Sequence, residues 1–392
     1  MYSLGLPAYL ALKEIWRNKG RFLLVSLVIA LITLLVLFIA ALGEGLANAN
    51  REYLSKLDAS LLVYHDKSDY IIGASHVDRS LLSSIRQVEG VAEAGQIGFA
   101  NADVLLPGVS APLKVSLIGV EPGRPGLPPV LQGRTFYSRL ASEVILDRSA
   151  ALRSGLKTGD TLTIRVSQGI KDQTYTLRVV GITDGEQYQF QPTIFVPFFT
   201  WDQVRPKSDA EINSTSLVSN VIAVRLKDPS HLDAVAVVRQ RIISQVNGVE
   251  AATISQAILA VPGYTAQQST IQTQAFFTMF IGLLVIGGFF QIQALQKVAQ
   301  IGVLKAIGAS NHVVGASSII QIILITSIGV SLGGFLTYLL SLSFPPTVPI
   351  VFNGQRTMIA IIALLLTGPA GGYVSIRYAT RIEPLKALGL SQ

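Results

Sequence analysis

Side chains that could do chemistry are few and scattered in this sequence of 392 residues. The chain has four histidines and no cysteine, which excludes disulfides, thiolate catalysis and thiolate metal sites. No two histidines have the spacing of a metal-binding pair, so we interpret each as a surface side chain. They are His65, His76, His231 and His312.

Sequence motifs for catalysis are also absent. The chain has no G-x-x-x-x-G-K-[ST] for nucleotide phosphates, no H-E-x-x-H for zinc and no G-x-S-x-G for acyl transfer. Carboxylates are plentiful between residues 44 and 274, but no motif pairs them. The sequence therefore predicts no catalytic residue, no metal and no cofactor in this chain.

The positive charge of this chain is unevenly distributed. Half of the residues are apolar and 14% are charged, whereas a soluble protein has about a quarter charged. Residues 44–274 hold 21 basic and 22 acidic side chains, and the rest of the chain holds 10 basic and 2 acidic ones. The net charge of +7 therefore comes from the parts outside this middle segment, and we expect no binding of nucleic acid.

Four uncharged apolar stretches are each long enough to cross a bilayer, which takes about 20 residues. They lie at residues 22–43, 275–296, 314–342 and 357–376. A cleaved signal peptide is the alternative for the first stretch, but this stretch is longer than a signal peptide's apolar core. The absence of any Asp, Glu, Lys or Arg from all four disfavours an ion-coupled carrier.

Cations beside these stretches predict the orientation in the membrane. Nine of the ten lie before the first span, between the second and third, or after the fourth; Arg356 is the exception. The positive-inside rule then places residues 1–21, 297–313 and 377–392 in the cytoplasm. Residues 44–274 and the short loop 343–356 are expected outside.

The large external segment has the texture of an α+β domain. Short β-runs separated by turns predict a β-rich insertion at about residues 100–220. The flanking parts, about 58–99 and 221–262, each carry a helical stretch, a V-x-G-V turn and a strand-like run. An internal duplication would explain this likeness, and two unrelated helix–turn–strand joints are the alternative.

Small residues and amphipathic segments predict how the membrane part is packed. Two G-x-x-x-G pairs would let helix backbones approach closely, and they are Gly329 with Gly333 and Gly368 with Gly372. Residues 1–21 are expected to form an amphipathic helix in the membrane plane, and an ordinary basic flank is the alternative. Loop 297–313 is unusually apolar for an exposed hairpin, which indicates a surface that docks into another protein.

This loop carries a resemblance to a known family. Its run Ile-Gly-Val-Leu-Lys-Ala-Ile-Gly-Ala-Ser closely resembles the coupling segment of FtsX-like or MacB-like permeases of ABC transporters. The starting segment ALKEIWRNKGRFLL, the runs GLKTGDTLTI and LRVVGI, and the ending from Arg377 to Leu388 are similar to the same family. Gln300 stands where the family often has Glu.

The resemblance implies a fold and a set of partners. The fold is an α-helical membrane protein with four transmembrane helices and a large α+β extracytoplasmic domain between the first and second spans. The partners are an ABC ATPase subunit that binds ATP and Mg, a second copy or a paralogue of the permease, membrane lipids, and in some members a membrane-fusion adaptor. The location is a bacterial plasma (inner) membrane, with both termini in the cytoplasm.

The resemblance also implies where the ATPase binds. The coupling residues would be Gln300, Ile301, Gly302, Val303, Leu304, Lys305, Ala306, Ile307, Gly308 and Ala309. Contacts of the C-terminal tail would come from Arg381, Glu383, Pro384, Leu385 and Lys386. Aspartate at Gly302 or Ile307 is expected to abolish stimulation of the ATPase without unfolding the protein.

Two functions follow from the resemblance. In the first, ATP hydrolysis by the partner moves the external domain, which exports or extracts a lipid, lipoprotein, peptide or other hydrophobic substrate. In the second, the chain is a signalling or scaffold subunit that senses a ligand or regulates a cell-envelope enzyme.

Overall fold

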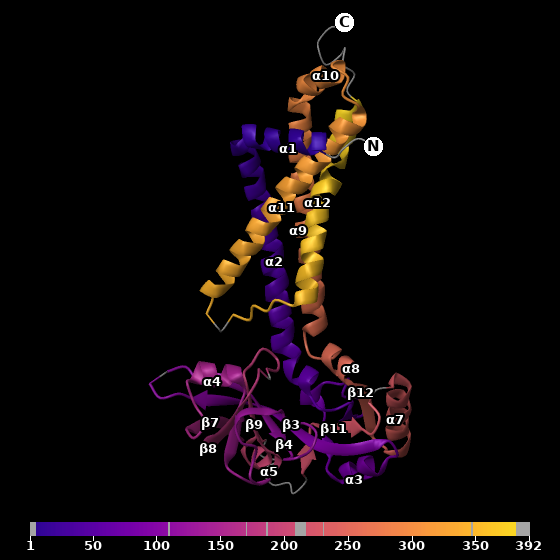
Figure 1. The fold of residues 1–392 in the computed structure, drawn as a ribbon. Helices are drawn as coiled ribbons and strands as arrows, with labels where there is room; N and C mark the ends of the chain where they lie inside the picture. The colour runs from indigo at the N-terminus through magenta and orange to yellow at the C-terminus, as the bar shows by residue number, and fades with distance from the viewer. Residues whose placement is uncertain are drawn as a thin grey trace. The chain divides into compact units, whose positions relative to one another are not determined.

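The fold was analysed in a computed structural model that describes residues 5–108, 110–169, 171–185, 187–207, 217–229, 231–345 and 348–381. The chain divides into two compact units, one formed by Met1–Gly45 with Gln268–Gln392 and the other by Leu46–Gln267 (Figure 1). Below they are called the helical unit and the α+β unit. Each is described by itself.

Long apolar helices make up the helical unit. Its elements are α1 (Gly5–Arg17), the first part of α2 (Lys19–Lys56), most of α9 (Tyr264–Gln296), α10 (Val298–Ala306), α11 (Asn311–Ser343) and α12 (Gly354–Arg381). In the described part of the chain, four helices are long and apolar enough to cross a membrane: α2, α9, α11 and α12. This confirms the four predicted spans and the position of the large domain between the first and the second. At about 1.5 Å per residue, the 38 residues of α2 extend roughly 57 Å, so the helix is longer than a span requires.

Helix α1 has the amphipathic character that its sequence predicts. Ala11 is fully buried and Ile15 packs against the core of the helical unit. Leu12 and Trp16 are exposed, Trp16 to 84%. Exposed apolar side chains on a basic helix are suited to a lipid headgroup region.

The short segment between α11 and α12 is tied to α2. The backbone N–H of Val351 donates to the carbonyl oxygen of Ala41 at 3.1 Å. Arg356, the one cation among the ten beside the spans that is expected outside, pairs with the carboxylate of Glu44, which is only 4% exposed. A buried carboxylate is costly without a partner, so this ion pair holds the start of α12 against α2.

A ten-stranded sheet organises the α+β unit. Its order is β12-β1-β11-β3-β4-β9-β6-β8-β5, with β7 paired to both β3 and β8. The strands are β1 (Leu61–His65), β3 (Val91–Leu105), β4 (Leu113–Val120), β5 (Val130–Gly133), β6 (Glu143–Leu146), β7 (Thr161–Gln168), β8 (Lys171–Thr183), β9 (Thr193–Pro197), β11 (Val221–Leu226) and β12 (Val249–Thr253). A separate small sheet joins β2 (Val77–Asp78) to β10 (Val218–Ser219).

One sheet thus runs through both parts that the sequence analysis separated at residue 100. Strand β3 has 15 residues and crosses that boundary, pairing with β11 at its start and with β4 and β7 further on. Alternate residues of β1 enter two different cores: Leu61 and Val63 enter one, and Leu62 and Tyr64 the other. The period of two along a strand explains this division.

Short helices cover this sheet. They are η1 (Ile72–Ala74), α3 (Ser80–Gln87), α4 (Arg148–Ser154), α5 (Phe198–Val204), α7 (Leu232–Gln245) and α8 (Ile254–Leu259). Helices α3 and α7, from the two segments that resemble each other, enter the same core. Arg86 of α3 donates to the Ala94 carbonyl at 2.9 Å, and Arg239 of α7 donates to the Ala251 carbonyl at 2.6 Å. The two segments therefore form matching helix–turn–strand units.

Two glycines make room for a tryptophan in the α+β unit. Gly98 of β3 lies opposite Gly119 of β4, and a Cβ atom on either would overlap the ring of Trp201. Trp201 is 2% exposed and stacks on Phe198 with ring centroids 5.5 Å apart. A tryptophan in this environment is a sensitive reporter of the unit's unfolding.

Asp147, the N-cap of α4, predicts a pH-dependent stability of this unit. Its carboxylate accepts hydrogen bonds from the backbone N–H groups of Ala150 and Thr193, but burial raises its pKa to about 7. The unfolded carboxyl titrates near 3.8, so at intermediate pH the native state holds a proton that the unfolded state has lost. We expect the unfolding free energy to rise as pH falls from about 8 to about 5, by up to about 1.4 kcal/mol per pH unit.

Fluorescence of Trp201 measures this dependence. The chain has two tryptophans, so the variant Trp16→Phe leaves Trp201 as the only reporter during denaturant unfolding. The control adds Asp147→Asn, which removes the titrating group and should flatten this part of the pH profile. Equal slopes with and without Asp147→Asn would contradict the assignment.

Candidate functional site

Helix α10 is the segment that the sequence analysis singled out for docking (Figure 1). It lies between α9 and α11 and ends in a defined turn. Gly308 has φ +103°, its N–H donates to the Lys305 carbonyl at 3.0 Å, and the Ala309 N–H donates to the Leu304 carbonyl at 3.0 Å. This pair of bonds is a Schellman motif, and glycine adopts its positive φ without strain.

An exposed apolar stripe follows one side of α10. Val303 is 45% exposed, Leu304 39% and Ile307 83%, and Gln300 is exposed one turn earlier. Residues three and four apart share a helix face, so these four side chains form one surface. We call Gln300, Val303, Leu304 and Ile307 the docking stripe.

The opposite side of α10 is buried. Ile301 is 8% exposed and packs with Val314 and Ala309, and Gly302 is also buried. Of the ten predicted coupling residues, these two therefore cannot contact a partner in this conformation. Aspartate at Gly302 would place a carboxylate in this buried side, so the expectation that it spares the fold stays a prediction. Ile307 is exposed, so a substitution there tests docking without disturbing the buried side of α10.

The predicted tail contacts lie almost entirely outside the described residues. Glu383, Pro384, Leu385 and Lys386 belong to that part of the chain, and Arg381 is the last residue of α12. Their contribution to a site stays a prediction.

All four glycines of the G-x-x-x-G pairs lie against another helix. A Cβ atom on Gly329 would lie 2.6 Å from Ile29 Cβ, and one on Gly333 would lie 2.6 Å from Thr33 Cβ, both in α2. On α12, Gly368 faces Thr326 and Gly372 faces Ile322, both in α11. Close approach of these backbones holds the spans together.

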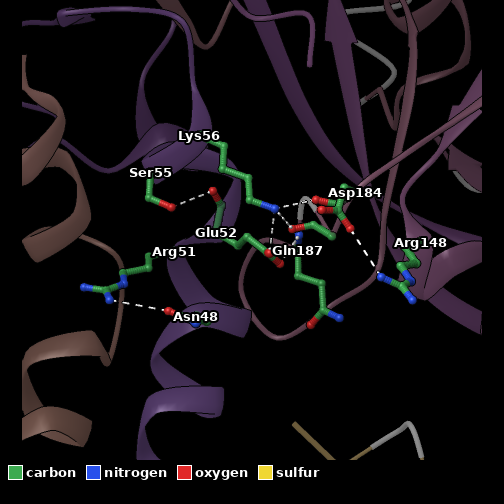
Figure 2. Close-up of polar contacts among 9 residues, drawn as sticks. Asn48, Arg51, Glu52, Ser55, Lys56, Arg148, Asp184 and Gln187 are labelled. Carbon is green, nitrogen blue, oxygen red and sulfur yellow. Dashed lines mark hydrogen bonds and ion pairs between the residues drawn. The ribbon is translucent and has the colours of Figure 1, made fainter. Parts of the chain in front are cut away.

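The end of α2 is fixed to the connection between β8 and β9 inside the α+β unit. Figure 2 shows the Lys56 ammonium beside the Glu52 carboxylate, with a distance of 2.9 Å between Nζ and Oε1. Lys56 also donates to the carbonyl oxygens of Asp184 and Gly185. The Tyr53 N–H donates to the Gln187 carbonyl at 3.0 Å.

Further contacts secure the same junction. Asp184 pairs with Arg148 across 3.5 Å (Figure 2). The rings of Tyr53 and Tyr188 meet edge to face with centroids 6.3 Å apart.

The described part of the chain contains no cluster of three or more His, Cys, Asp or Glu side chains whose geometry could hold a metal ion.

Comparison with known proteins gives two family matches. Residues 22–241 match the MacB-like periplasmic core domain, and residues 273–384 match the FtsX-like permease C-terminal domain. Together they cover the four spans and most of the domain between them.

The individual relatives and solved structures share less than 30% sequence identity with this chain. A protein of Staphylococcus haemolyticus (strain JCSC1435), named as a hemin transport system permease protein HrtB, is 24% identical over 386 residues, which cover 97% of this chain and 99% of the relative. A macrolide export ATP-binding/permease protein MacB 1 of Yersinia pestis bv. Antiqua is 29% identical over 133 residues, 32% of this chain and 20% of the relative. The crystal structure of the periplasmic region of MacB from Actinobacillus actinomycetemcomitans covers 52% of this chain and 93% of its own, with 14% identity and a TM-score of 0.37.

Proposed function

Because the chain belongs to the family of ABC transporter permeases with a MacB-like periplasmic core domain and an FtsX-like C-terminal domain, we propose that its docking stripe couples a separate ATPase subunit to movement of the α+β unit. The single observation that carries this proposal is the exposure of three apolar side chains on α10, a helix between two spans. Apolar side chains on a short exposed helix are suited to a groove on a partner.

Topology supports the proposal. The cations at residues 1–21, 297–313 and 377–392 support, by the positive-inside rule, a cytoplasmic location of the docking stripe and both termini at a bacterial plasma membrane. ATP and Mg are bound by the ATPase, which meets the stripe there. The α+β unit then lies outside.

Transmission to the outside would use α2. This helix runs without a break from Lys19 to Lys56, and its last turns are fixed to the β8–β9 connection. Two permease copies would flank a pair of ATPase subunits, since four spans packed through glycines leave little room for a substrate path within one copy.

The substrate class is hydrophobic or amphipathic, and its movement is export or extraction outside the bilayer. Hemin is the first compound to test, because one relative that matches over 99% of its length is named as a hemin transport permease.

Purification of the affinity-tagged permease from its native membranes tests this function. We expect an ABC ATPase to copurify, and hemin to stimulate ATP hydrolysis by the complex in nanodiscs. A complex that hydrolyses ATP without any response to hemin would exclude hemin and leave the permease assignment intact. Absence of an ABC ATPase from the purified material would contradict the proposal.

A further inference from the structure

Lys297 joins α9 to α10, and its side chain is mostly buried. Its side chain is 13% exposed, whereas lysines are rarely buried unless they are paired. From the sequence alone, Lys297 is only one of the cations expected on the cytoplasmic side. No motif distinguishes it from Lys305, eight residues further on.

Three other helices contact the Lys297 ammonium. It forms an ion pair with the carboxylate of Glu14 in α1 and donates to Gln321 Oε1 in α11 at 3.0 Å. It also lies 5.6 Å from the ring centroid of Phe22 in α2. One charged group thus connects α1, α2 and α11 to the joint from which α10 begins.

Polar groups continue beside it into a small cavity. The cavity has a volume of about 20 Å³, enough for one water molecule, and Gln293, Lys297, Ile301 and Gln321 are among its lining residues. Gln293 and Gln321 are each 4% exposed, so polar side chains of α9 and α11 share this enclosed space with the ammonium. Ile301 brings the buried side of α10 to the same place.

We propose that Lys297 is a positioning residue that makes α1, α10 and α11 move as one body when the ATPase binds and releases. This inference rests on the proposed function of the docking stripe. A buried ion pair resists separation because each partner would be left as an unpaired charge. Force applied at Ile307 is therefore carried to α1 and α11 through Lys297, and the docking stripe keeps its angle to the spans.

Charge-neutral and charge-reversed variants of the purified permease–ATPase complex test the inference. Lys297→Gln and Glu14→Gln should each lower the permease-stimulated rate of ATP hydrolysis about tenfold. Affinity for the ATPase should change little, since the docking stripe stays intact. The matched control is Lys13→Gln, which removes an exposed charge from α1 next to Glu14 and should keep the stimulated rate.

Two combinations separate positioning from simple damage to the fold. The double variant Glu14→Gln with Lys297→Gln leaves no unpaired charge, so its loss should not exceed that of either single variant. The exchange of Glu14→Lys with Lys297→Glu should recover most of the rate. Additive losses, no recovery in the exchange, or single variants with the original rate would each overturn the inference. If Ile307→Asp uncouples the complex while the Lys297 variants do not, only this inference fails; if Ile307→Asp has no effect, the proposed function fails.

Discussion

Replacing Ile307 with aspartate is expected to weaken binding of the ATPase about a hundredfold and to remove its stimulation by the permease. Ile307 is 83% exposed, so the carboxylate is solvated in the free permease and the fold is kept. In the complex, the same carboxylate would have to enter an apolar groove without a partner, at a cost of several kcal/mol. Affinity and ATP hydrolysis are measured on the purified components.

Ile307→Val is the matched control for this variant. It keeps an apolar side chain at the same place, so binding should stay within about threefold of the original. Equal affinity for the aspartate and valine variants would show that the docking stripe does not contact the ATPase.

The second large effect is expected in the packing of the spans. Gly333→Ala should destabilise the protein by about 1–3 kcal/mol, because its methyl group would lie 2.6 Å from Thr33 Cβ and equally close to the Ala30 carbonyl of α2. Either α11 or α2 has to move to admit it. The measurement is the thermal unfolding temperature in detergent.

Gly334 provides the control one residue away. A Cβ atom there would have only Leu37 Cδ1 near it, at 3.9 Å, which is an ordinary contact. Gly334→Ala should therefore leave stability unchanged or raise it by up to about 1 kcal/mol, since alanine favours a helix more than glycine does. Similar unfolding temperatures for the two variants would contradict the close approach of α11 to α2.

Much of the membrane part could be predicted from composition alone. The four spans follow from uncharged stretches of sufficient length, and helix α1 (Gly5–Arg17) follows from the amphipathic pattern of its residues. In the α+β unit, short apolar runs between turns indicate a β-rich part at about residues 100–220, where strands β4 to β9 lie.

The sequence does not predict which strands pair with one another when they are far apart in the chain. Strand β3 continues past residue 100 because β4 and β7 pair with its second half, while β11 pairs with its first half. Strands β7 and β11 are distant from it in the chain. The predicted boundary between an α+β part and a β-rich insertion therefore does not interrupt the sheet.

The structure separates the residues of α10 into a buried side and an exposed side, and the residue pattern does not predict this separation. The Ile-Gly pair at 301 and 302 belongs to the resemblance but faces the core, while Val303 and Ile307 face outward. The apolar pattern of α10 has little periodicity, since both sides are apolar, so no face could be assigned in advance. The contacts of Lys297 could not be predicted from the sequence either, because its partners Glu14 and Gln321 lie in two other helices of the chain.

Site-specific crosslinking tests the central claim that the docking stripe meets the ATPase. The chain has no cysteine, so Val303→Cys and Ile307→Cys can each carry a single photoreactive maleimide, with Leu131→Cys, 64% exposed in β5, as the control. We predict crosslinks to the ATPase from positions 303 and 307 and none from position 131. Failure of both stripe positions to crosslink in an active complex would contradict the account.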